Sequence, residues 1–316
     1  MNYLDFESKL KEVEEKISVL SQSVEDEKTM KELQKLEKKR MDLMKSTYTK
    51  LTDWQVVQLS RHPDRPYFKD LLPLVFTDFQ ELHGDRAFGD DLAVIGGIAK
   101  LNNKPVMVIG QEKGRDTKSK IKHNFGMMHP EGYRKALRLM KLAEKFDMPI
   151  VTFIDTPGAY PGIKAEERGQ SEAIARNLFE MSALKVPVVC TVIGEGCSGG
   201  ALGIGVGDKL LMLQYSYFAT ISPEGCASIL HKTAEKASEV TAMMNITSGR
   251  LKELNIVDGL IAEPLGGAHR SFEATATNIR EALSKEINEL CGMDVETRNA
   301  VRYEKMMSYG RFTEGK

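Results

Sequence analysis

The chain has 316 residues, 41% of them hydrophobic, and this size and composition allow a large core in one or two domains. Its 44 basic residues nearly balance its 45 acidic ones, and the net charge of −1 argues against a dedicated nucleic-acid binder. No apolar run approaches the roughly 20 residues of a membrane span, and residues 1–11 show no signal peptide. Because four cysteines without an evident pairing also suit a reducing compartment, we expect a cytoplasmic protein without membrane attachment.

Residues 1–50 are expected to form a helical N-terminal arm, because apolar residues recur at helical spacing on both sides of a polar break at 21–28. The spacing suits a helix pair folded on its own core and equally an arm packed on a partner subunit. Residues 51–295 are expected to form the main domain, and residues 296–316 a C-terminal tail. The apolar positions of the arm are Phe6, Leu10, Val13, Ile17 and Leu20, followed by Met30, Leu33, Leu36, Met41 and Met44.

Turn-forming residues at His62–Tyr67 predict a linker into the main domain, and two basic stretches lie beyond it. Either stretch would suit an anionic ligand, but charge stripes on helices are more often solvated faces, and we favour that interpretation. Near the end of the domain, Ile279, Leu283, Ile287 and Leu290 predict a closing amphipathic helix. The basic residues are Lys113, Arg115, Lys118, Lys120 and Lys122 in the first stretch, and Arg134, Lys135, Arg138 and Lys141 on a predicted helix in the second.

Two similar helix-to-strand units occupy the middle of the chain. Predicted helices over residues 133–146 and 172–184 each lead into an apolar strand, and the strands end in glycine-rich turns at residues 155–162 and 194–201. Repeated units of this length imply parallel strands joined by crossovers. Both turns then lie at the carboxyl edge of one sheet, where ligands bind in α/β folds.

The second glycine turn matches two known enzyme patterns. Residues 194–199 read G-x-G-x-x-G, but no acid occurs near Ala219, where a dinucleotide-binding fold would place its ribose-binding carboxylate. Residues 196–200 read G-x-S-x-G, which would make Ser198 a hydrolase nucleophile, with Asp258 and His269 downstream in the required order. With six histidines in the chain, a downstream histidine is expected by chance, so this pattern is weak.

A third interpretation is a backbone oxyanion hole at Gly199, Gly200 and Ala201 that needs no nucleophile. Glycines in such a turn let main-chain N–H groups approach a ligand closely and take up positive φ. The alternative is a tight turn whose glycines only allow close packing of helix and strand.

The segments DTPGAYPG (155–162), AEERGQSE (165–172) and GEGCSGGA (194–201) carry a family resemblance. With them the sequence resembles the α subunits of bacterial acetyl-CoA carboxylase carboxyltransferases. The likeness covers nearly the whole chain, with one departure at Cys197, where glycine is expected in many relatives. Further matching segments lie at residues 61–67, 84–86, 124–127, 130–136, 222–227 and 263–270.

The resemblance implies a crotonase-like (ClpP/crotonase) α/β core and one half of a carboxyltransferase. This enzyme moves a carboxyl group from carboxybiotin on a biotin carboxyl carrier protein to acetyl-CoA, and the malonyl-CoA formed serves fatty acid biosynthesis. The other half is a β subunit with a zinc ribbon, in an α2β2-type assembly, while ATP is used by a different subunit, the biotin carboxylase. This chain has no C-x-x-C pair, so it reads as the α half, with no metal of its own.

By similarity, main-chain amides form the oxyanion hole on the carboxybiotin side. We name no general base, because the biotin anion itself could remove the methyl proton of acetyl-CoA. The basic stretches would then contact CoA phosphates or an acidic carrier domain if they are not solvated faces. A serine hydrolase using Ser198 and a catalytically silent assembly subunit remain as alternatives, and the intact glycine turns argue against the silent one. The expected hole residues are Gly199, Gly200 and Ala201, and the expected substrate-binding residues are Gly158, Ala159, Tyr160 and Gly196.

Overall fold

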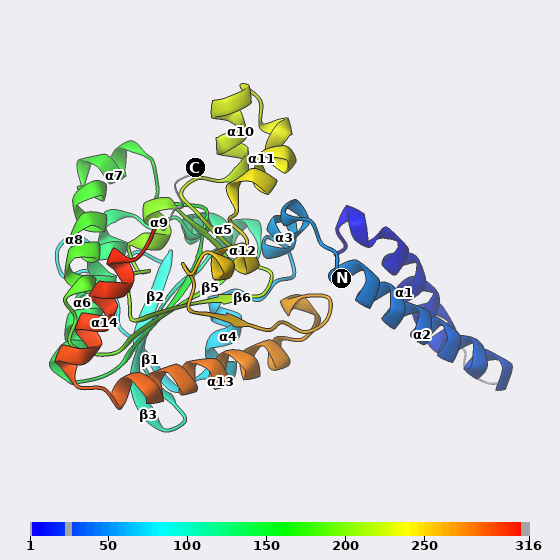
Figure 1. Ribbon diagram of the computed structural model, residues 1–316, viewed down its shortest axis with the longest axis horizontal. Helices are drawn as coiled ribbons and strands as arrows, with labels where there is room; N and C mark the ends of the chain where they lie inside the picture. Colours follow the sequence, from blue (N-terminus) through cyan, green and yellow to red (C-terminus); the bar gives the residue numbers. More distant parts are fainter. Residues whose placement is uncertain (1, 23–26, 311–316) are drawn as a thin grey trace, which may run out of the picture.

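The computed structural model describes residues 2–22 and 27–310 (Figure 1). Over these residues the chain forms a helical hairpin at its N-terminus and an α/β body built on one mixed sheet with the strand order β1-β2-β3-β4-β5-β6-β8, while β7 pairs with β5. The strands are β1 (Thr77–Glu81), β2 (Val94–Leu101), β3 (Lys104–Gln111), β4 (Ile150–Thr156), β5 (Val188–Cys197), β6 (Lys209–Leu213), β7 (Tyr217–Ala219) and β8 (Gly259–Ile261).

Helices connect these strands and cover both faces of the sheet (Figure 1). The α-helices are α1 (Ser8–Ser21), α2 (Glu27–Tyr48), α3 (Asp53–Ser60), α4 (Phe68–Val75), α5 (Thr117–Lys122), α6 (Pro130–Lys145), α7 (Ile163–Glu167), α8 (Gln170–Ser182), α9 (Ser198–Leu202), α10 (Pro223–His231), α11 (Ala237–Met244), α12 (Ser248–Glu253), α13 (Phe272–Cys291) and α14 (Val295–Met307). Short 3-10 turns lie at Asp5–Glu7, Asn124–Gly126, Ala234–Lys236 and Ala268–Arg270.

The predicted parallel pair of strands is confirmed. Strands β4 and β5 run parallel with Ile150 opposite Val188, and every residue of both strands is buried. Continuous burial is typical of parallel strands, because helices cover both of their faces. On one face α6 and α8 pack over Ile150 and Ile154, and on the other α4 and α13 pack over Val151 and Phe153.

The closing helix is also confirmed. It is α13, and the four apolar side chains predicted to face the core, Ile279, Leu283, Ile287 and Leu290, are all buried. Helix α14 follows it, and none of the described helices combines the length and the apolar character that crossing a membrane requires.

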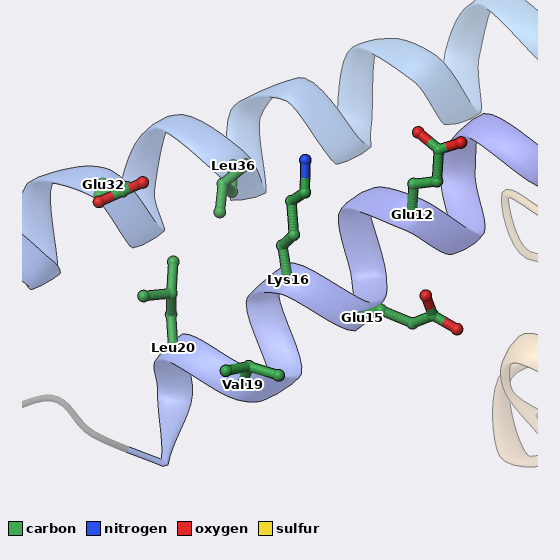
Figure 2. Close-up of a pocket in the computed structure, with 7 residues that line it drawn as sticks. All are labelled: Glu12, Glu15, Lys16, Val19, Leu20, Glu32 and Leu36. Carbon is green, nitrogen blue, oxygen red and sulfur yellow. The ribbon is translucent and has the colours of Figure 1, made fainter.

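The N-terminal hairpin of α1 and α2 is attached to the body at one end and extends away from it at the other (Figure 1). At the attached end Leu10, Met44 and Tyr48 pack with Leu59 and Tyr215 of the body. Further out, Val19 is 68% exposed, and a hollow of about 630 Å³ lies between the two helices (Figure 2). The side chains around this hollow are Glu12, Glu15, Lys16, Val19, Leu20, Glu32 and Leu36.

The segment expected to be a linker, His62–Tyr67, is instead packed into the body. The Arg65 side chain is 1% exposed, and its guanidinium group donates two hydrogen bonds to the Glu263 carboxylate, at 2.9 and 2.6 Å. Its Nε donates to the Ile193 carbonyl oxygen at 2.8 Å. The segment turns, as its composition predicts, but the buried ion pair fixes it against the sheet.

Candidate active site

The two glycine turns meet at the carboxyl edge of the sheet. Gly200 in α9 lies directly against the Gly158–Ala159 peptide: a Cβ on Gly200 would be 2.3 Å from the Gly158 carbonyl carbon and 2.6 Å from the Ala159 nitrogen. Real Cβ atoms do not approach backbone so closely, so a side chain at residue 200 would displace one turn or the other. The expectation that both turns lie together is confirmed.

The need for glycine at residue 200 comes from this close approach, not from its backbone angles. Residues 199 and 200 have ordinary negative φ, and the left-handed conformation falls on Ser198, at φ 56°, and on Gly158, at φ 148°. The expectation of positive φ at Gly199 and Gly200 is therefore wrong. Cys197 is extended (φ −115°, ψ 133°), a conformation open to any residue, so cysteine here introduces no backbone strain.

Helix α9 is a single short turn, and the first N–H groups of a helix have no partner within it. The amides of Gly199 and Gly200 fall in this position, whereas the Ala201 amide makes the first bond of the helix, back to the Cys197 carbonyl. Gly199 is partly exposed, while Gly200 and Ala201 are buried. Beside them Ser198 and Leu202 line a pocket of about 320 Å³, whose other walls are mostly apolar side chains from β7, α11, α12 and the residues that directly follow these elements.

The first turn is held by its own side chains. The Thr156 hydroxyl accepts a hydrogen bond from the Gly158 amide at 3.1 Å and donates to the Gly158 carbonyl at 2.7 Å. Tyr160 is partly exposed, its ring lies 4.4 Å from the His129 ring, and its carbonyl accepts from Gln170 Nε2 at 3.0 Å. Gly158, Ala159 and Tyr160 therefore line the same edge of the sheet as α9.

Gly196 lies deeper than the other expected binding residues. It is buried within β5, paired with Thr156 of β4 and Phe218 of β7. A Cβ at this position would be 2.6 Å from the Phe218 ring and 3.3 Å from Ile154. Its part in substrate binding stays a prediction, whereas its part in packing is visible.

A buried charge cluster supports the strands directly behind the turns. Lys113 Nζ lies 2.7 Å from Asp155 Oδ1 and 2.7 Å from Glu195 Oε1, and its side chain is 12% exposed. Arg61 donates to Glu195 Oε2 at 2.7 Å and to Glu224 Oε1 at 2.7 Å. These charges come from segments far apart in the sequence, and together they anchor the carboxyl ends of β4 and β5.

The cluster sets the protonation of its members. Burial alone would raise the pKa of Glu195, but the charges of Lys113 and Arg61 outweigh it and lower that pKa to about 2. Burial raises the pKa of Asp155, although Lys113 opposes this rise. The Tyr217 hydroxyl donates to Glu195 Oε2 at 2.7 Å, and burial followed by the Glu195 charge raises its pKa, so Tyr217 stays protonated.

The basic stretch on α6 is not the solvated face that the sequence favours, whereas the first stretch is largely exposed apart from Lys113. Lys113 belongs to the buried cluster, and on α6 Lys135 is fully buried, with Nζ 2.6 Å from Asp90. Arg134 pairs with Asp85 at 2.8 Å, and Arg138 donates to the Gly84 carbonyl at 2.9 Å. Arg134, Lys135 and Arg138 therefore bind the loop before β2, while Lys141 pairs with Glu180 of α8 at 2.9 Å. Lys118, in contrast, is exposed.

The hydrolase interpretation is not supported by the geometry. The Asp258 carboxylate accepts hydrogen bonds from the Leu210 amide at 2.6 Å and from Lys305 Nζ at 2.9 Å. The His269 ring is stacked on His62, 3.9 Å between centroids. Over residues 2–22 and 27–310 no hydrogen bond joins Ser198 to either residue, and burial raises the pKa of the neighbouring Cys197 thiol to about 11. No activated nucleophile is present in this turn. Residues 2–22 and 27–310 contain no group of three or more His, Cys, Asp or Glu side chains that could hold a metal ion.

A family model described as acetyl co-enzyme A carboxylase carboxyltransferase-like matches residues 3–310. The chain belongs to this family. It is 84% identical over 314 residues to the acetyl-coenzyme A carboxylase carboxyl transferase subunit alpha of Francisella tularensis subsp. novicida (strain U112), an alignment that covers 99% of this chain and 100% of the relative. The predicted assignment to the α-type subunit of a carboxyltransferase is thereby confirmed.

Solved structures of the same fold include transcarboxylase 12S, which is 17% identical with a TM-score of 0.59 and covers 72% of this chain and 42% of that one. The β subunit of P. aeruginosa geranyl-CoA carboxylase is 16% identical with a TM-score of 0.53, and covers 84% and 48%. At these identities the likeness is one of fold. It confirms the crotonase-like α/β core.

Proposed function

We propose that the chain is one half of a shared active site that transfers a carboxyl group from carrier-bound carboxybiotin to acetyl-CoA, with a β-type subunit as the other half. Membership of the carboxyltransferase family supports the reaction class. We place the site where the two glycine turns meet. A Cβ on Gly200 would lie 2.3 Å from the Gly158 carbonyl carbon, so the α9 amides lie directly against the turn after β4.

The residues at this edge fit the group that they would bind. Carboxybiotin supplies the carboxyl group, and negative charge develops on its ureido oxygen as that group leaves. The amides of Gly199 and Gly200, with Ala201 buried beside them, offer main-chain donors for such an oxygen, and fixed donors stabilise developing charge without reorganisation. The adjoining pocket of about 320 Å³ is at the lower end of the range for small-ligand sites and is mostly apolar.

The charged residues behind the site do not act as a base in this proposal. A carboxylate whose pKa is about 2, such as Glu195, is a weak proton acceptor at neutral pH. Lys113 and Arg61 are occupied by carboxylates at 2.7 Å. Gly158, Ala159 and Tyr160 form the facing wall, and Gly196 supports it from within the sheet.

The same proposal places the chain in a larger enzyme. A β partner with a zinc ribbon completes the site in an α2β2-type assembly, a biotin carboxyl carrier protein delivers the carboxyl group, and a biotin carboxylase uses ATP to load it. The malonyl-CoA formed serves fatty acid biosynthesis. The four cysteines are all free, which supports a cytoplasmic location.

The test compares two alanine substitutions in the co-expressed complex with the β partner, with malonyl-CoA formation as the assay. Gly200→Ala places a methyl group against backbone and shifts the turn, so we expect carboxyl transfer to fall by about a hundredfold, the scale of a lost oxyanion donor. Gly199→Ala is the matched control, because its Cβ would meet only Ile174 side-chain atoms, at 3.4 Å, and it keeps the same amide.

Size-exclusion chromatography and circular dichroism establish that both variants are folded and assembled. A folded, assembled Gly200→Ala complex as fast as Gly199→Ala would place the site elsewhere. Malonyl-CoA formation by this chain without the β partner would contradict the shared site.

A further inference from the structure

Gln111, the last residue of β3, connects the two glycine turns through its side-chain amide. The side chain is fully buried, Oε1 accepts a hydrogen bond from the Asp155 amide at 3.0 Å, and Nε2 donates to the Gly200 carbonyl oxygen at 2.7 Å. The second proton of Nε2 faces Met128 Sδ at 3.3 Å. The orientation of the amide follows from chemistry, because the Asp155 N–H needs an acceptor and the Gly200 C=O needs a donor.

The Gly200 carbonyl depends on this donor because α9 ends too soon to supply one. In a continuing helix the Ile204 amide would bond to Gly200, but here it bonds to the Ala201 carbonyl at 3.3 Å. The Gly199 carbonyl does accept from the Gly203 amide, at 2.9 Å. Gln111 thus takes the one carbonyl that the short turn leaves without a backbone partner.

The carbonyl of Gly200 and the N–H of Ala201 belong to one planar peptide group and point in opposite directions. Two hydrogen bonds therefore hold this peptide, one from Gln111 to the Gly200 carbonyl and one from the Ala201 N–H to the Cys197 carbonyl, and they fix the orientation of the turn. The N–H groups of Gly199 and Gly200, which have no partner within this turn, are the free donors of the proposed oxyanion hole.

We propose that Gln111 is a positioning residue for carboxyl transfer, which holds the α9 turn, and with it the Gly199 and Gly200 amides, through the Gly200 carbonyl. The inference rests on the proposed hole at Gly199, Gly200 and Ala201. Through Oε1 the same side chain fixes the start of the facing turn at Asp155. The side-chain amide of Gln111 thereby fixes the distance between the two glycine turns.

The test uses the complex with the β partner and separates kcat from KM. Gln111→Met keeps the length of the side chain but has no donor, and we expect kcat to fall roughly tenfold or more while KM for acetyl-CoA changes less than about twofold. Asn177→Leu is the matched control: Asn177 is a fully buried amide that donates to the Gly203 carbonyl at 2.8 Å and the Tyr133 carbonyl at 3.0 Å. It bonds to the end of the same short turn but to a different peptide, so we expect it to lower stability and leave kcat near the wild-type value.

Gln111→Glu supplies a readout that a purely structural role would not change. An ionised carboxylate cannot donate to Gly200, but burial raises the pKa of a glutamic acid, and its protonated form can. We expect the deficit in kcat relative to wild type to shrink as the pH falls from about 8 to about 6. The nearby charges of Lys113, Asp155 and Glu195 are present in both enzymes, so their titration cancels in the ratio.

Wild-type kcat in a folded Gln111→Met complex would overturn the inference, as would an equal loss in Asn177→Leu. If Gln111→Met does not fold, a pH-independent deficit in Gln111→Glu would overturn it. Failure of the proposed hole gives a different result, since Gly200→Ala would then also keep its activity.

Discussion

At the scale of single residues, Lys113 is the cation that two buried carboxylates share. It contacts Asp155 and Glu195 at 2.7 Å each, and Arg61 supplies a second cation on the far side of Glu195. Removing one partner of a buried pair is strongly destabilising, because the remaining charge stays buried without compensation.

We therefore predict that Lys113→Met lowers the free energy of unfolding by about 3–5 kcal/mol. Lys118→Met, an exposed position in the same basic stretch, is the control and should change it by less than about 0.5 kcal/mol. Urea denaturation followed by circular dichroism measures both. Equal stability of the two variants would mean that the cluster contributes nothing to the fold.

The sequence predicted the glycine turns of this site but not the side chains behind them. The turns were visible because each directly follows an apolar run, and parallel strands bring such turns together. The clustering of Lys113, Glu195 and Arg61 was missed, because their pairing joins distant segments and has no local pattern. A usable signal did exist: Gln111, Glu112 and Lys113 directly follow the apolar run of β3, so they too lie at the carboxyl edge of the sheet.

At the scale of secondary-structure elements, α14 closes the body through two buried arginines, Arg298 and Arg302. Arg302, 1% exposed, pairs with Asp208 at 2.8 Å and donates to the carbonyl oxygens of Met181, Leu184 and Val186 at 3.1, 2.9 and 3.2 Å. These carbonyls lie where α8 ends and β5 begins. Helix α14 therefore supplies donors to the backbone carbonyls of this connection.

We predict that Arg302→Met destabilises the protein by about 3 kcal/mol or more, since it leaves Asp208 buried without its partner. Tyr303→Ala changes the next residue of the same helix, which is 66% exposed, and should have little effect. Thermal unfolding of both variants by scanning calorimetry gives the comparison. A melting temperature for Arg302→Met as high as that for Tyr303→Ala would show that α14 is not an anchor.

The helix–strand units and the closing helix were predictable because burial on one side leaves a periodic pattern. The antiparallel start of the sheet was not foreseen, although a signal for it is present. Asn102 and Asn103 connect β2 to β3 with φ of 47° and 65°, the two positive values of a type I′ hairpin turn, which favours asparagine. The packing of His62–Tyr67 could not be read locally, because its partner Glu263 lies far along the chain.

At the scale of the whole molecule, a stacked histidine pair joins the N-terminal segment to the C-terminal part of the body. His62 Nδ1 accepts from the Asp64 amide at 3.1 Å, so the proton is on Nε2, which lies 3.2 Å from the Asn2 carbonyl. The His269 ring is 3.9 Å away. Burial lowers the pKa of both rings, that of His269 to about 3, so the pair is neutral in the folded protein.

This pair makes stability depend on pH. An unfolded histidine binds a proton below about pH 6.5, whereas folded His269 does so only near its pKa of about 3. The contribution is therefore complete above about pH 6.5 and declines as the pH falls through this window. We predict that the wild type loses on the order of 1–2 kcal/mol of unfolding free energy between about pH 7 and pH 5, and that His269→Phe, which keeps the stack without a proton site, loses less.

Urea denaturation at the two pH values measures this difference. His231→Gln alters an exposed histidine and serves as the control, with the wild-type pH dependence expected. Identical pH dependence in the wild type and His269→Phe would show that the stack does not control acid stability.

The close packing of Gly200 against the Gly158–Ala159 peptide also limits how this site can evolve. The two turns are in direct contact, with no space between them for a larger side chain. A bulkier residue in one turn therefore requires the backbone of the other turn to move, although the turns follow separate strands. Substitutions that one turn tolerates therefore depend on the residues present in the other turn. A new substrate preference would have to arise by exchanging the two loops as a unit.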